Sequence, residues 1–346
     1  DTFTQLLNTF LVLFKSNNES INNLTFRAKK EDNQRATLFL ILFEPILKNY
    51  ENYLKEHNEI DFSDMINMAT SLISNSQFSS PFKYIIIDEF QDISQSRYHL
   101  IKALLDQKPN TKLLCVGDDW QSIYRFAGSD IGVFTGFSEY FETSTISGFK
   151  RKTNKSYIEH TYRFDNKLID LSSNFILKNP NQIEKSLKSN KQSKLNPLTI
   201  RKYNDAERNG SEAHKVLNQV LDEIVKKEKD NDVSILLLGR YDFERRIIDD
   251  SSHITKQYNK LLNRYDYIYK ENHNLKINFL TVHTSKGLES DYIIILNGNS
   301  GTYGFPSEIS DDPLLKFLLS KADQFPNGEE RRLFYVAMTR AKKHVH

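Results

Sequence analysis

Two pairs of adjacent carboxylates follow short apolar runs in the sequence. The run YIII is followed directly by Asp88 and Glu89, and the run LLCV is followed, after one glycine, by Asp118 and Asp119. An acid at the carboxyl end of a parallel strand lies at the rim of the sheet, where ligands bind. Asp88 is therefore placed to bind Mg²⁺, and Glu89 to position and deprotonate an attacking water. This spacing indicates hydrolytic chemistry at the end of the first strand.

Two other interpretations of the acid pairs remain open on the spacing alone. The first is structural, because a strand can end in acids that only meet solvent, and so short a motif is weakly specific. The second is a Mg²⁺-dependent nuclease, because two-metal sites also gather carboxylates. The choice between them depends on the sequence around the acids.

The elements that must position these acids are indicated by the hydrophobic period. Residues 1 to about 60 show the period of helices, with Leu38, Ile41, Leu42 and Ile46 spaced along one helical face. The segment IDFSDMINMATSLI then predicts a further helix, capped by Asp61 or by the serine two residues later.

Beyond that helix the pattern changes to strands. The order YIII, SQSRYHLIKALLD, LLCV predicts a βαβ unit whose parallel sheet is covered on both faces. We place a domain boundary in the polar and basic stretch 143–156. Strand-like runs then recur, between helical patterns, at 198–203, 233–239, 277–282 and 292–296. The predicted fold class is α/β, with two parallel-sheet domains and an N-terminal helical segment.

Composition limits the function classes only loosely. The 346 residues carry 47 Lys and Arg against 45 Asp and Glu, so any basic surface for nucleic acid has to be local. The single cysteine, Cys115, excludes disulfides within the chain and fits a reducing, cytoplasmic setting. No apolar run reaches the length of a membrane span, so no membrane partner is expected.

The acids belong to a longer series of motifs. DEFQD, GDDWQSIYRFAGSD, HTYRF, TVHTSKGLESDYIIIL and EERRLFYVAMTRAKK occur in that order, between residues 88 and 343. Together they resemble motifs II to VI of the UvrD/Rep helicases of superfamily 1. Trp120 and the Asn-Pro that follows TYRF resemble the helicase IV branch of that family. The resemblance covers the chain from about residue 38 to its end, and five motifs in order are far more specific than one.

The resemblance implies a motor of two RecA-like lobes with ATP in the cleft between them. Asp88 would bind Mg²⁺ and Glu89 would activate water. Gln121 would sense the γ-phosphate and link it to DNA. Arg163 and Arg340 would reach the γ-phosphate from the second lobe, and a permanently charged guanidinium suits charge that spreads over phosphate oxygens.

The same resemblance assigns residues that hold the nucleotide. Tyr162 would stack on adenine, and the alternative is that it is an ordinary core tyrosine. Gly287 and Glu289, in KGLE, would contact the ribose or the phosphate network. The implied cofactors are therefore ATP and Mg²⁺.

DNA contacts require aromatic faces for stacking and donors for phosphates. Phe126 occupies the place where many relatives carry a base-stacking Trp, and Ala127 stands where an Arg is common; both depart from the family pattern. His283 and Lys286 would contact DNA phosphate. The implied partners are single-stranded DNA and duplex junctions, with 3′-to-5′ movement.

One expected motif does not occur in these residues. The phosphate-binding pattern G-x-x-x-x-G-K-[ST] is absent from the sequence. We therefore expect a C-terminal part of a longer helicase with an incomplete first lobe, inactive alone because phosphate binding is weakened. The expected division is a helical remnant at 1–60, the rest of the first lobe at 61–148 and the second lobe at 149–346.

Two rivals to the motor remain. One is a non-catalytic nucleic-acid-binding module on a degraded helicase fold, favoured by the absent phosphate loop but disfavoured by the retained acids, glutamine and arginines. The other is the Mg²⁺-dependent nuclease. Cleavage of labelled DNA without ATP, abolished by Asp88→Ala, would favour the nuclease.

Overall fold

The computed structural model describes residues 2–142, 150–203, 211–229, 231–260, 264–270, 275–321 and 323–346. They form two compact units. Unit 1 comprises Asp1–Lys155 and Ser310–Ala322, and unit 2 comprises Ser156–Ile309 and Asp323–His346. The boundary expected near residue 148 lies outside the described residues, so the three-part division stays a prediction. Unit 1 is discontinuous in sequence, and we call its second piece, residues 310–322, the strap.

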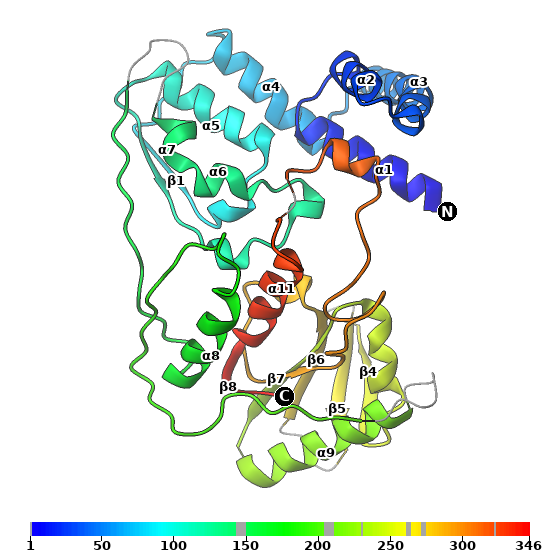
Figure 1. Cartoon of the computed structure of the whole chain (residues 1–346), viewed down its shortest axis with the longest axis vertical. Helices are drawn as coiled ribbons and strands as arrows, with labels where there is room; N and C mark the ends of the chain where they lie inside the picture. Colours follow the sequence, from blue (N-terminus) through cyan, green and yellow to red (C-terminus); the bar gives the residue numbers. More distant parts are fainter. Residues whose placement is uncertain are drawn as a thin grey trace. The chain divides into compact units, whose positions relative to one another are not determined.

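Unit 1 begins with helices and continues into a small parallel sheet (Figure 1). Its elements are α1 (Thr2–Ser16), α2 (Ile21–Lys30), α3 (Gln34–His57), α4 (Phe62–Ser74), β1 (Tyr84–Ile87), α5 (Gln95–Gln107), β2 (Lys112–Cys115), α6 (Ile131–Thr135) and α7 (Phe137–Phe141). Asp61 is the residue that caps α4, because its carboxylate accepts the Asp64 N–H at 2.8 Å.

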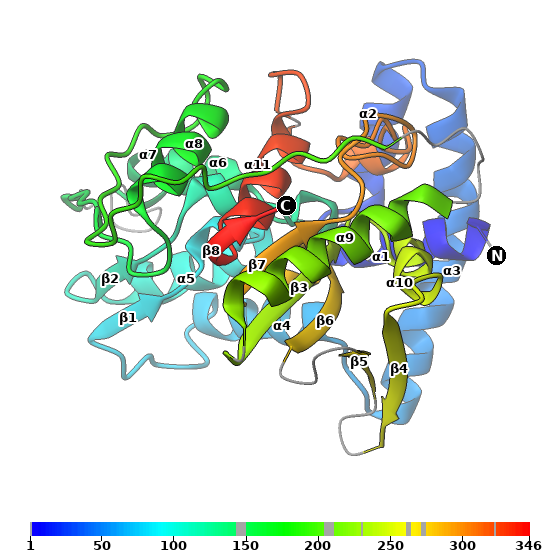
Figure 2. The same cartoon turned by 90° about the horizontal axis from the view of Figure 1, so that it is seen from below.

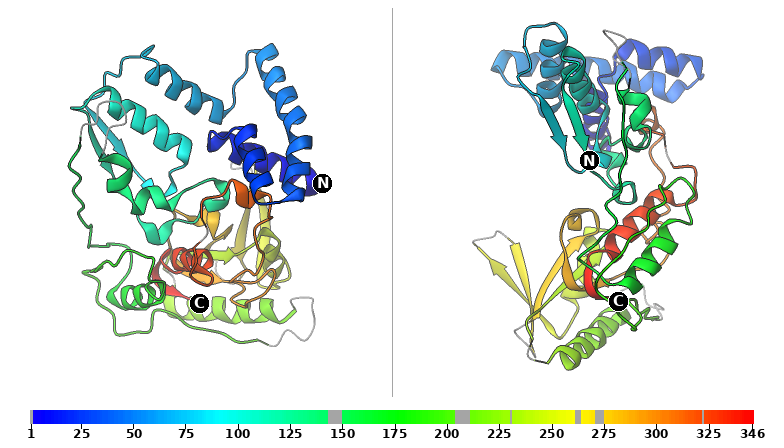
Figure 3. Two further views of the ribbon diagram at one scale, coloured as in Figure 1. Left: turned by 45° about the horizontal axis from the view of Figure 1, so that its top comes forward. Right: turned by 90° about the vertical axis from the view of Figure 1, so that its left-hand side faces the viewer.

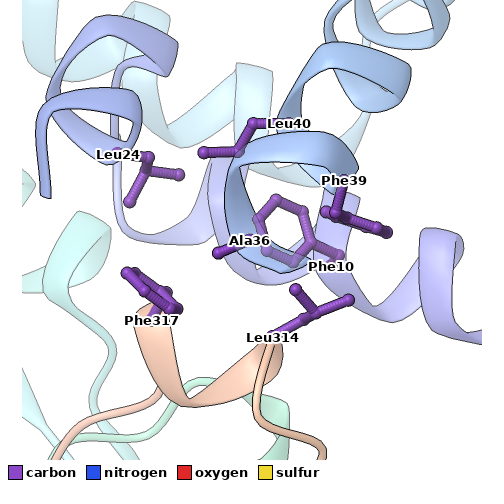
Figure 4. A pocket seen from close by; sticks show the side chains of 7 residues that line it. All are labelled: Phe10, Leu24, Ala36, Phe39, Leu40, Leu314 and Phe317. Carbon is purple, nitrogen blue, oxygen red and sulfur yellow. The ribbon is translucent and has the colours of Figure 1, made fainter. Parts of the chain in front are cut away.

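The helices α1–α3 bury an aromatic core that the strap completes. Phe10 contacts Phe39 and Phe43 edge-on at 4.8 Å, and Leu314 and Leu318 of the strap are buried in the same cluster. Figure 4 shows Leu314 and Phe317 turned toward the helices. The gap left between them is only about 10 Å³, about the size of one water. The strap therefore belongs to this core.

Polar contacts fix the strap at both of its ends within unit 1. Arg35 pairs with Asp312 at 3.1 Å, and the Asn17 amide donates to the Leu318 carbonyl. Arg125, in the GDDWQSIYRF motif, pairs with Asp311 at 2.7 Å and donates to the Ser320 carbonyl at 2.9 Å. The strap thus connects the N-terminal helices with the motif that carries Gln121 and Phe126.

The apolar face predicted for α3 is not the buried one. Leu38, Ile41, Leu42 and Ile46 are exposed. The helix instead buries a neighbouring set of side chains, Ala36, Phe39, Leu40, Phe43 and Leu47. The prediction was wrong because α3 carries apolar residues around most of its circumference, and the larger phenylalanines pack against α1.

The sheet of unit 1 is parallel, as predicted, with Ile87 opposite Cys115. Its inner face, which includes Ile85 and Leu113, packs against α5–α7. Its outer face is exposed, with Tyr84 and Ile86 each 72% accessible. The expectation of cover on both faces is therefore not met by the residues that the structure describes.

Unit 2 is built on a six-stranded sheet (Figure 2). Its elements are α8 (Asn166–Ile176), α9 (Ser211–Glu228), β3 (Val233–Gly239), α10 (Arg246–Asp249), β4 (Ile254–Asn259), β5 (Arg264–Tyr269), β6 (Leu275–Thr281), β7 (Ser290–Ile295), α11 (Gly328–Met338) and β8 (Ala341–Val345). The strand order is β4-β5-β6-β3-β7-β8, with β6-β3-β7-β8 parallel and the β4-β5 hairpin antiparallel.

Helices pack against this sheet and against one another. Leu217, Leu221 and Ile224 of α9 are buried against Ile235 and Leu237 of β3, and Figure 2 shows α9 lying across the sheet. The helices α8 and α11 run side by side (Figure 3), with Phe175 and Phe334 in contact at 5.5 Å. The fold is α/β, as the sequence predicted.

One predicted strand of unit 2 does not form. The runs predicted at 233–239, 277–282 and 292–296 correspond to β3, β6 and β7. Residues 198–203 are not a strand, and only Leu198 bridges to Val345 of β8. Pro197 also has no N–H to donate to a neighbouring strand.

Candidate active site

The acids that follow β1 and β2 lie at one edge of the unit 1 sheet. The backbone pairing continues past the strands, because Val116 donates to the Ile87 carbonyl at 2.8 Å and Phe90 donates to the Val116 carbonyl at 2.9 Å. Asp88 and Glu89 are therefore held next to the segment that leads into Asp118. The sequence predicted this arrangement from the order of the strands.

Glu89 has an unusual backbone conformation. Its φ of 49° and ψ of 41° place it in the left-handed region, which costs a residue with a Cβ roughly 1–2 kcal/mol. Its N–H donates to the Asp88 carboxylate at 2.9 Å, and both side chains are exposed. Strain of this kind persists where the surrounding structure imposes it, and it is common at functional sites. The conformation aims Glu89 away from the strand direction.

A buried glutamine connects the two acid-bearing strand ends. Gln91 donates to the Glu89 carboxylate at 2.5 Å and accepts the Asp118 N–H at 2.8 Å. The Asp118 carboxylate in turn accepts from the Gln121 amide at 2.6 Å and from the Trp120 N–H at 3.1 Å. We call Glu89, Gln91, Asp118 and Gln121 the Gln91 network. It joins two predicted catalytic residues through two that the sequence analysis did not assign.

The missed residues had a signal in the sequence. Gln91 is the amide within DEFQD, two residues after Glu89, and Asp118 is the first acid after LLCVG. A polar side chain that becomes buried in a turn has to find hydrogen-bond partners. Gln91 is fully buried, and both ends of its amide are hydrogen-bonded.

We expect Gly117→Ala to lower the free energy of unfolding by about 1–3 kcal/mol, the usual range for overpacking. A Cβ at Gly117 would lie 2.6 Å from the Gln91 side-chain oxygen and 2.8 Å from Phe134. The matched control is Gly298→Ala, where a Cβ would meet nothing within 4 Å. Urea denaturation measures both. Equal stability of the two variants would show that Gln91 moves without cost.

The aromatic residues of the same motif separate into a buried and an exposed one. Trp120 is fully buried, whereas Phe126 is 53% exposed on the turn Arg125–Ala127, with its ring 6.1 Å from that of Tyr124. Phe126 is thus not a core residue, and its ring is accessible to a stacking partner.

In unit 2, side chains far apart in sequence meet at Glu289. Arg163 donates to the Glu289 carboxylate at 3.0 Å and to the Thr339 carbonyl at 3.3 Å. Lys342 contacts the other carboxylate oxygen at 2.7 Å. The hydrogen bonds from Lys342 and Arg163 lower the pKa of Glu289, so the group stays ionised. The structure therefore brings Arg163 and Glu289 together in an ion pair, and their roles at a nucleotide stay predictions.

Arg340 lies inside unit 2. Its residue surface is only 1% exposed, and its guanidinium donates to the Val336 carbonyl at 3.0 Å, to Leu288 O at 3.4 Å and to Thr339 Oγ1 at 3.3 Å. A contact with a phosphate would require this buried guanidinium to become accessible. Its role at the γ-phosphate stays a prediction.

Two further predicted nucleotide residues are accessible. The Tyr162 ring is 78% exposed, so it is not the packing residue that the alternative interpretation allowed. Gly287 has a φ of 83°, and a Cβ there would meet nothing within 4 Å. Glycine is therefore needed at 287 for the backbone conformation and not for lack of space.

The two predicted DNA residues of unit 2 follow β6 directly. His283 begins the turn His283–Ser285, Lys286 comes next, and both are partly buried. Desolvation by burial, with the nearby positive charge of Arg240, lowers the pKa of His283 to about 4. His283 is therefore neutral at pH 7 and can contact a phosphate as a hydrogen-bond donor but not as a cation.

This pKa predicts a pH dependence of stability. The pKa of His283 is lower in the folded protein than the ordinary 6.5. The folded protein therefore has its full stability with respect to this group above pH 6.5, and loses free energy of unfolding as the pH falls from 6.5 toward 4. We expect His283→Gln to lose less stability than wild type between pH 7 and pH 4 in urea titrations. His346 has a similarly low pKa, so His346→Gln is a positive control and should change the pH profile in the same direction. An unchanged wild-type profile in His283→Gln would contradict the assignment.

The carboxylates of unit 1 suit Mg²⁺, which takes part of its ligands from phosphates and waters, better than a metal ion whose ligands all come from the protein. Within the described ranges, no three His, Cys, Asp or Glu side chains are grouped as a complete metal site. Mg²⁺ is commonly bound by one or two carboxylates together with substrate phosphates and waters. The exposed carboxylate of Asp88 fits that role.

Family profiles match both units. The profile of the UvrD/REP helicase N-terminal domain matches residues 4–142, and that of the UvrD-like helicase C-terminal domain matches residues 244–346. The chain belongs to the UvrD/Rep helicase family. The matched ranges contain all the predicted site residues except Tyr162 and Arg163, which lie between them. Membership in this family implies RecA-like lobes, in agreement with the α/β fold of the two units.

Individual relatives give the same family. DNA helicase IV of Escherichia coli K12 is 34% identical over 304 residues, which are 88% of this chain and 39% of that protein. The ATP-dependent DNA helicase Rep of Buchnera aphidicola from Acyrthosiphon pisum is 30% identical over 215 residues, 60% of this chain and 30% of that protein. The chain thus spans about a third of the length of these UvrD/Rep relatives. None of its described helices has the length and apolar character needed to cross a bilayer.

Proposed function

We propose that this chain is part of the motor of an ATP-dependent DNA helicase that moves 3′ to 5′ along single-stranded DNA and opens duplex junctions. The observation that carries the proposal is the Gln91 network. It connects Glu89, the candidate base, with Gln121, the candidate γ-phosphate sensor, through hydrogen bonds of 2.5–2.8 Å. The names of the E. coli and Buchnera relatives, both DNA helicases, support it.

The residues of unit 1 would carry the hydrolytic step. Asp88 would hold Mg²⁺, which when bound neutralises charge on the phosphate oxygens. Glu89 would orient a water and take its proton. A change in the phosphates at Gln121 would be transmitted by hydrogen bonds to Asp118, Gln91 and Glu89. This path offers a physical link between the state of the nucleotide and the position of the base.

The residues of unit 2 would hold the nucleotide and DNA. Arg163, oriented by Glu289, would neutralise phosphate charge, and the exposed Tyr162 ring would stack on adenine. Arg340 would act only after its buried guanidinium becomes accessible. Neutral His283, with Lys286 of unit 2 and Phe126 of unit 1, would contact single-stranded DNA. A cytoplasmic location fits the single cysteine.

Hydrolysis is expected to require residues beyond these 346. The pattern G-x-x-x-x-G-K-[ST] does not occur in the sequence, and the backbone amides and lysine of such a loop normally cradle the phosphates. The rival interpretation, a non-catalytic nucleic-acid-binding module, keeps the DNA contacts and dispenses with the hydrolysis.

The test is ATP hydrolysis at millimolar Mg²⁺, with and without single-stranded DNA, by this chain and by a longer protein that contains it. We expect DNA-stimulated hydrolysis by the longer protein and none by this chain. A longer protein that binds DNA but does not hydrolyse ATP would support the binding module. Mg²⁺-dependent cleavage of labelled DNA without ATP, lost in Asp88→Ala, would support the nuclease.

A further inference from the structure

The strap belongs to unit 1 by its packing, but the chain enters it from unit 2 and leaves it into unit 2. Unit 2 includes the residues up to Ile309, before the strap, and those from Asp323, after it. The other connection between the units follows Lys155. The strap is therefore a second mechanical connection between the units, in addition to the one that a simple succession of two domains requires.

One side chain of unit 1 holds the strap close to both of its ends. The Arg125 guanidinium pairs with Asp311 at 2.7 Å, and its Nε donates to the Ser320 carbonyl at 2.9 Å. Ser320 Oγ also donates to the Ser129 carbonyl at 3.0 Å. The Arg125 side chain is only 12% exposed, so its ion pair is screened less than a surface pair. Between these two points the strap packs into the core of α1–α3 (Figure 4).

Residues of unit 2 are fixed just before and just after the strap. Before it, the Ser307 N–H donates to the Glu330 carboxylate at 3.0 Å. After it, the Asp323 carboxylate accepts from Arg332 at 2.7 Å and from Asn179 at 2.7 Å. The strap is thus attached to a firmly bonded residue of unit 2 on each side.

The links between these fixed residues are short. Asp311 is the fourth residue after Ser307, and Asp323 is the third residue after Ser320. At about 3.3–3.6 Å per residue, the two links can extend to at most about 14 Å and about 11 Å. Neither link can absorb a large movement of unit 2, so such a movement has to pull on the docked strap.

A pull on the strap would reach unit 1 through Arg125. Arg125 begins a short turn, and Phe126, the candidate DNA contact, is its next residue. The turn packs closely against α1, because a Cβ at Gly128 would lie 3.0 Å from Ser16 Oγ and 3.4 Å from the Leu13 side chain. Leu13 belongs to the same core as the strap. The turn is therefore in contact with the strap and with the helices on which the strap is docked.

We propose that the strap is a coupling arm, which transmits movement of unit 2 to the turn that carries Phe126, with Arg125 as the positioning residue through which it acts. The proposal rests on the proposed function, in which ATP hydrolysis drives movement along single-stranded DNA. Closure of two domains around a ligand is a common movement in such enzymes. Because both links are short, the strap moves with unit 2, and Arg125 passes that movement to the turn.

The experiment measures DNA stimulation, which is the ratio of the ATP hydrolysis rates with saturating single-stranded DNA and without DNA. It uses the longer protein that contains this chain. Arg125→Ala is expected to lower this ratio by about tenfold, within the usual range of coupling between two sites. The rate without DNA should stay within about twofold, because Arg125 binds the strap and has no place in the hydrolytic step.

The matched control is Arg35→Ala, which removes the neighbouring ion pair of the strap. Arg35 lies on α3 and pairs with Asp312 at 3.1 Å, next to the aspartate that Arg125 binds. This pair fixes the strap to the helices and does not involve the turn. Arg35→Ala should therefore leave DNA stimulation unchanged.

A second variant lengthens the links and keeps the docking contacts. Gly-Ser-Gly inserted after Ile309 and again after Lys321 adds about 10 Å to each link, and longer loops cost little stability. If the strap transmits movement, this variant should also lose about tenfold in DNA stimulation. The same insertion after Leu195, in an exposed loop of unit 2, is the control and should have no effect.

The two variants together decide the proposal. Wild-type DNA stimulation in the variant with lengthened links would overturn the coupling arm, even if Arg125→Ala loses stimulation, because Arg125 would then act on the turn alone. A wild-type protein that hydrolyses ATP without any stimulation by DNA would overturn the proposed function, and the coupling arm with it. Circular dichroism checks that each variant is folded. Asp311→Asn, which keeps the size of the side chain, replaces Arg125→Ala if that variant does not fold.

Discussion

Glu89→Gln is expected to lower the kcat of DNA-stimulated ATP hydrolysis by about 100- to 10 000-fold, the usual contribution of a general base. The amide has the size of the carboxylate and can still accept a hydrogen bond from Gln91, but it cannot accept a proton from water. Affinities for ATP and single-stranded DNA should therefore stay within about twofold, since no binding group is removed. The measurement is steady-state hydrolysis and equilibrium binding with the longer protein.

The control for this result is Glu51→Gln, an exposed glutamate on α3 with no place in the Gln91 network. It should leave kcat unchanged. A Glu89→Gln protein with wild-type kcat would remove Glu89 from the base role. If Glu89→Gln instead weakens ATP affinity as much as it lowers kcat, Glu89 is a binding residue. The Gln91 network would then only hold the site in shape.

Arg332→Ala is expected to lower the free energy of unfolding by about 3–5 kcal/mol, as removal of one partner from a buried ion pair does. Arg332 pairs with Asp323 at 2.7 Å, and their side chains are only 4% and 7% exposed. The Asp323 carboxylate also accepts from Asn179 at 2.7 Å, from Asn181 at 3.0 Å and from Phe325 N–H at 3.0 Å. Without Arg332, a charged carboxylate stays buried with neutral donors alone.

The pH dependence of this loss identifies its cause. Burial acts to raise the pKa of Asp323, but the hydrogen bonds from Asn181, Phe325 N–H, Asn179 and Arg332 together lower it. The wild-type contribution is therefore present above the ordinary pKa of 3.8 and disappears as the pH falls through the lower folded value. The difference between Arg332→Ala and wild type should shrink as the carboxyl group protonates.

Urea denaturation between pH 7 and pH 3 measures this effect. The control is Lys188→Ala, which removes an exposed pair with Glu159 at 2.6 Å and should change stability little, because solvent screens exposed ion pairs. A loss for Arg332→Ala as small as for Lys188→Ala would contradict the assignment. A large loss that does not change with pH would point to the packing of the Arg332 stem and not to its charge.

The sequence predicted local elements well and their packing less well. The strands YIII and VSILLLG could be read from continuous apolar runs, and the Asp61 cap from its position before an apolar helix. The β4-β5 hairpin was missed because ITKQYN carries no apolar alternation, and because the tyrosines at every second position of RYDYIY were not taken as a strand signal. The buried face of α3 was wrong because a helix that is apolar on several sides does not indicate which side has a neighbour.

Some features of the candidate site could likewise be predicted from the sequence, and others could not. The edge of the sheet that carries Asp88 and Asp118 follows from strand order alone. The contact of Arg163 with Glu289 joins positions 126 residues apart. No hydrophobic period or spacing in the sequence relates these two positions. The left-handed conformation of Glu89 had no signal either, since a glutamate rarely adopts it. Such features depend on tertiary structure and were accessible only through the family resemblance or the structure itself.

The strap has a consequence for how the protein matures on the ribosome. The helices α1–α3 are complete once residue 57 is made, but their core lacks Leu314 and Leu318 until the strap emerges. Residues 58–309, which include all of Ser156–Ile309, are synthesised in between, a delay of about 13–50 s at elongation rates of about 5–20 residues per second. During that time Phe10, Phe39 and Leu24 form an unfinished apolar surface on the nascent chain. Unit 1 therefore completes its fold only after most of unit 2 has been made, which reverses the usual N-to-C order of domain folding.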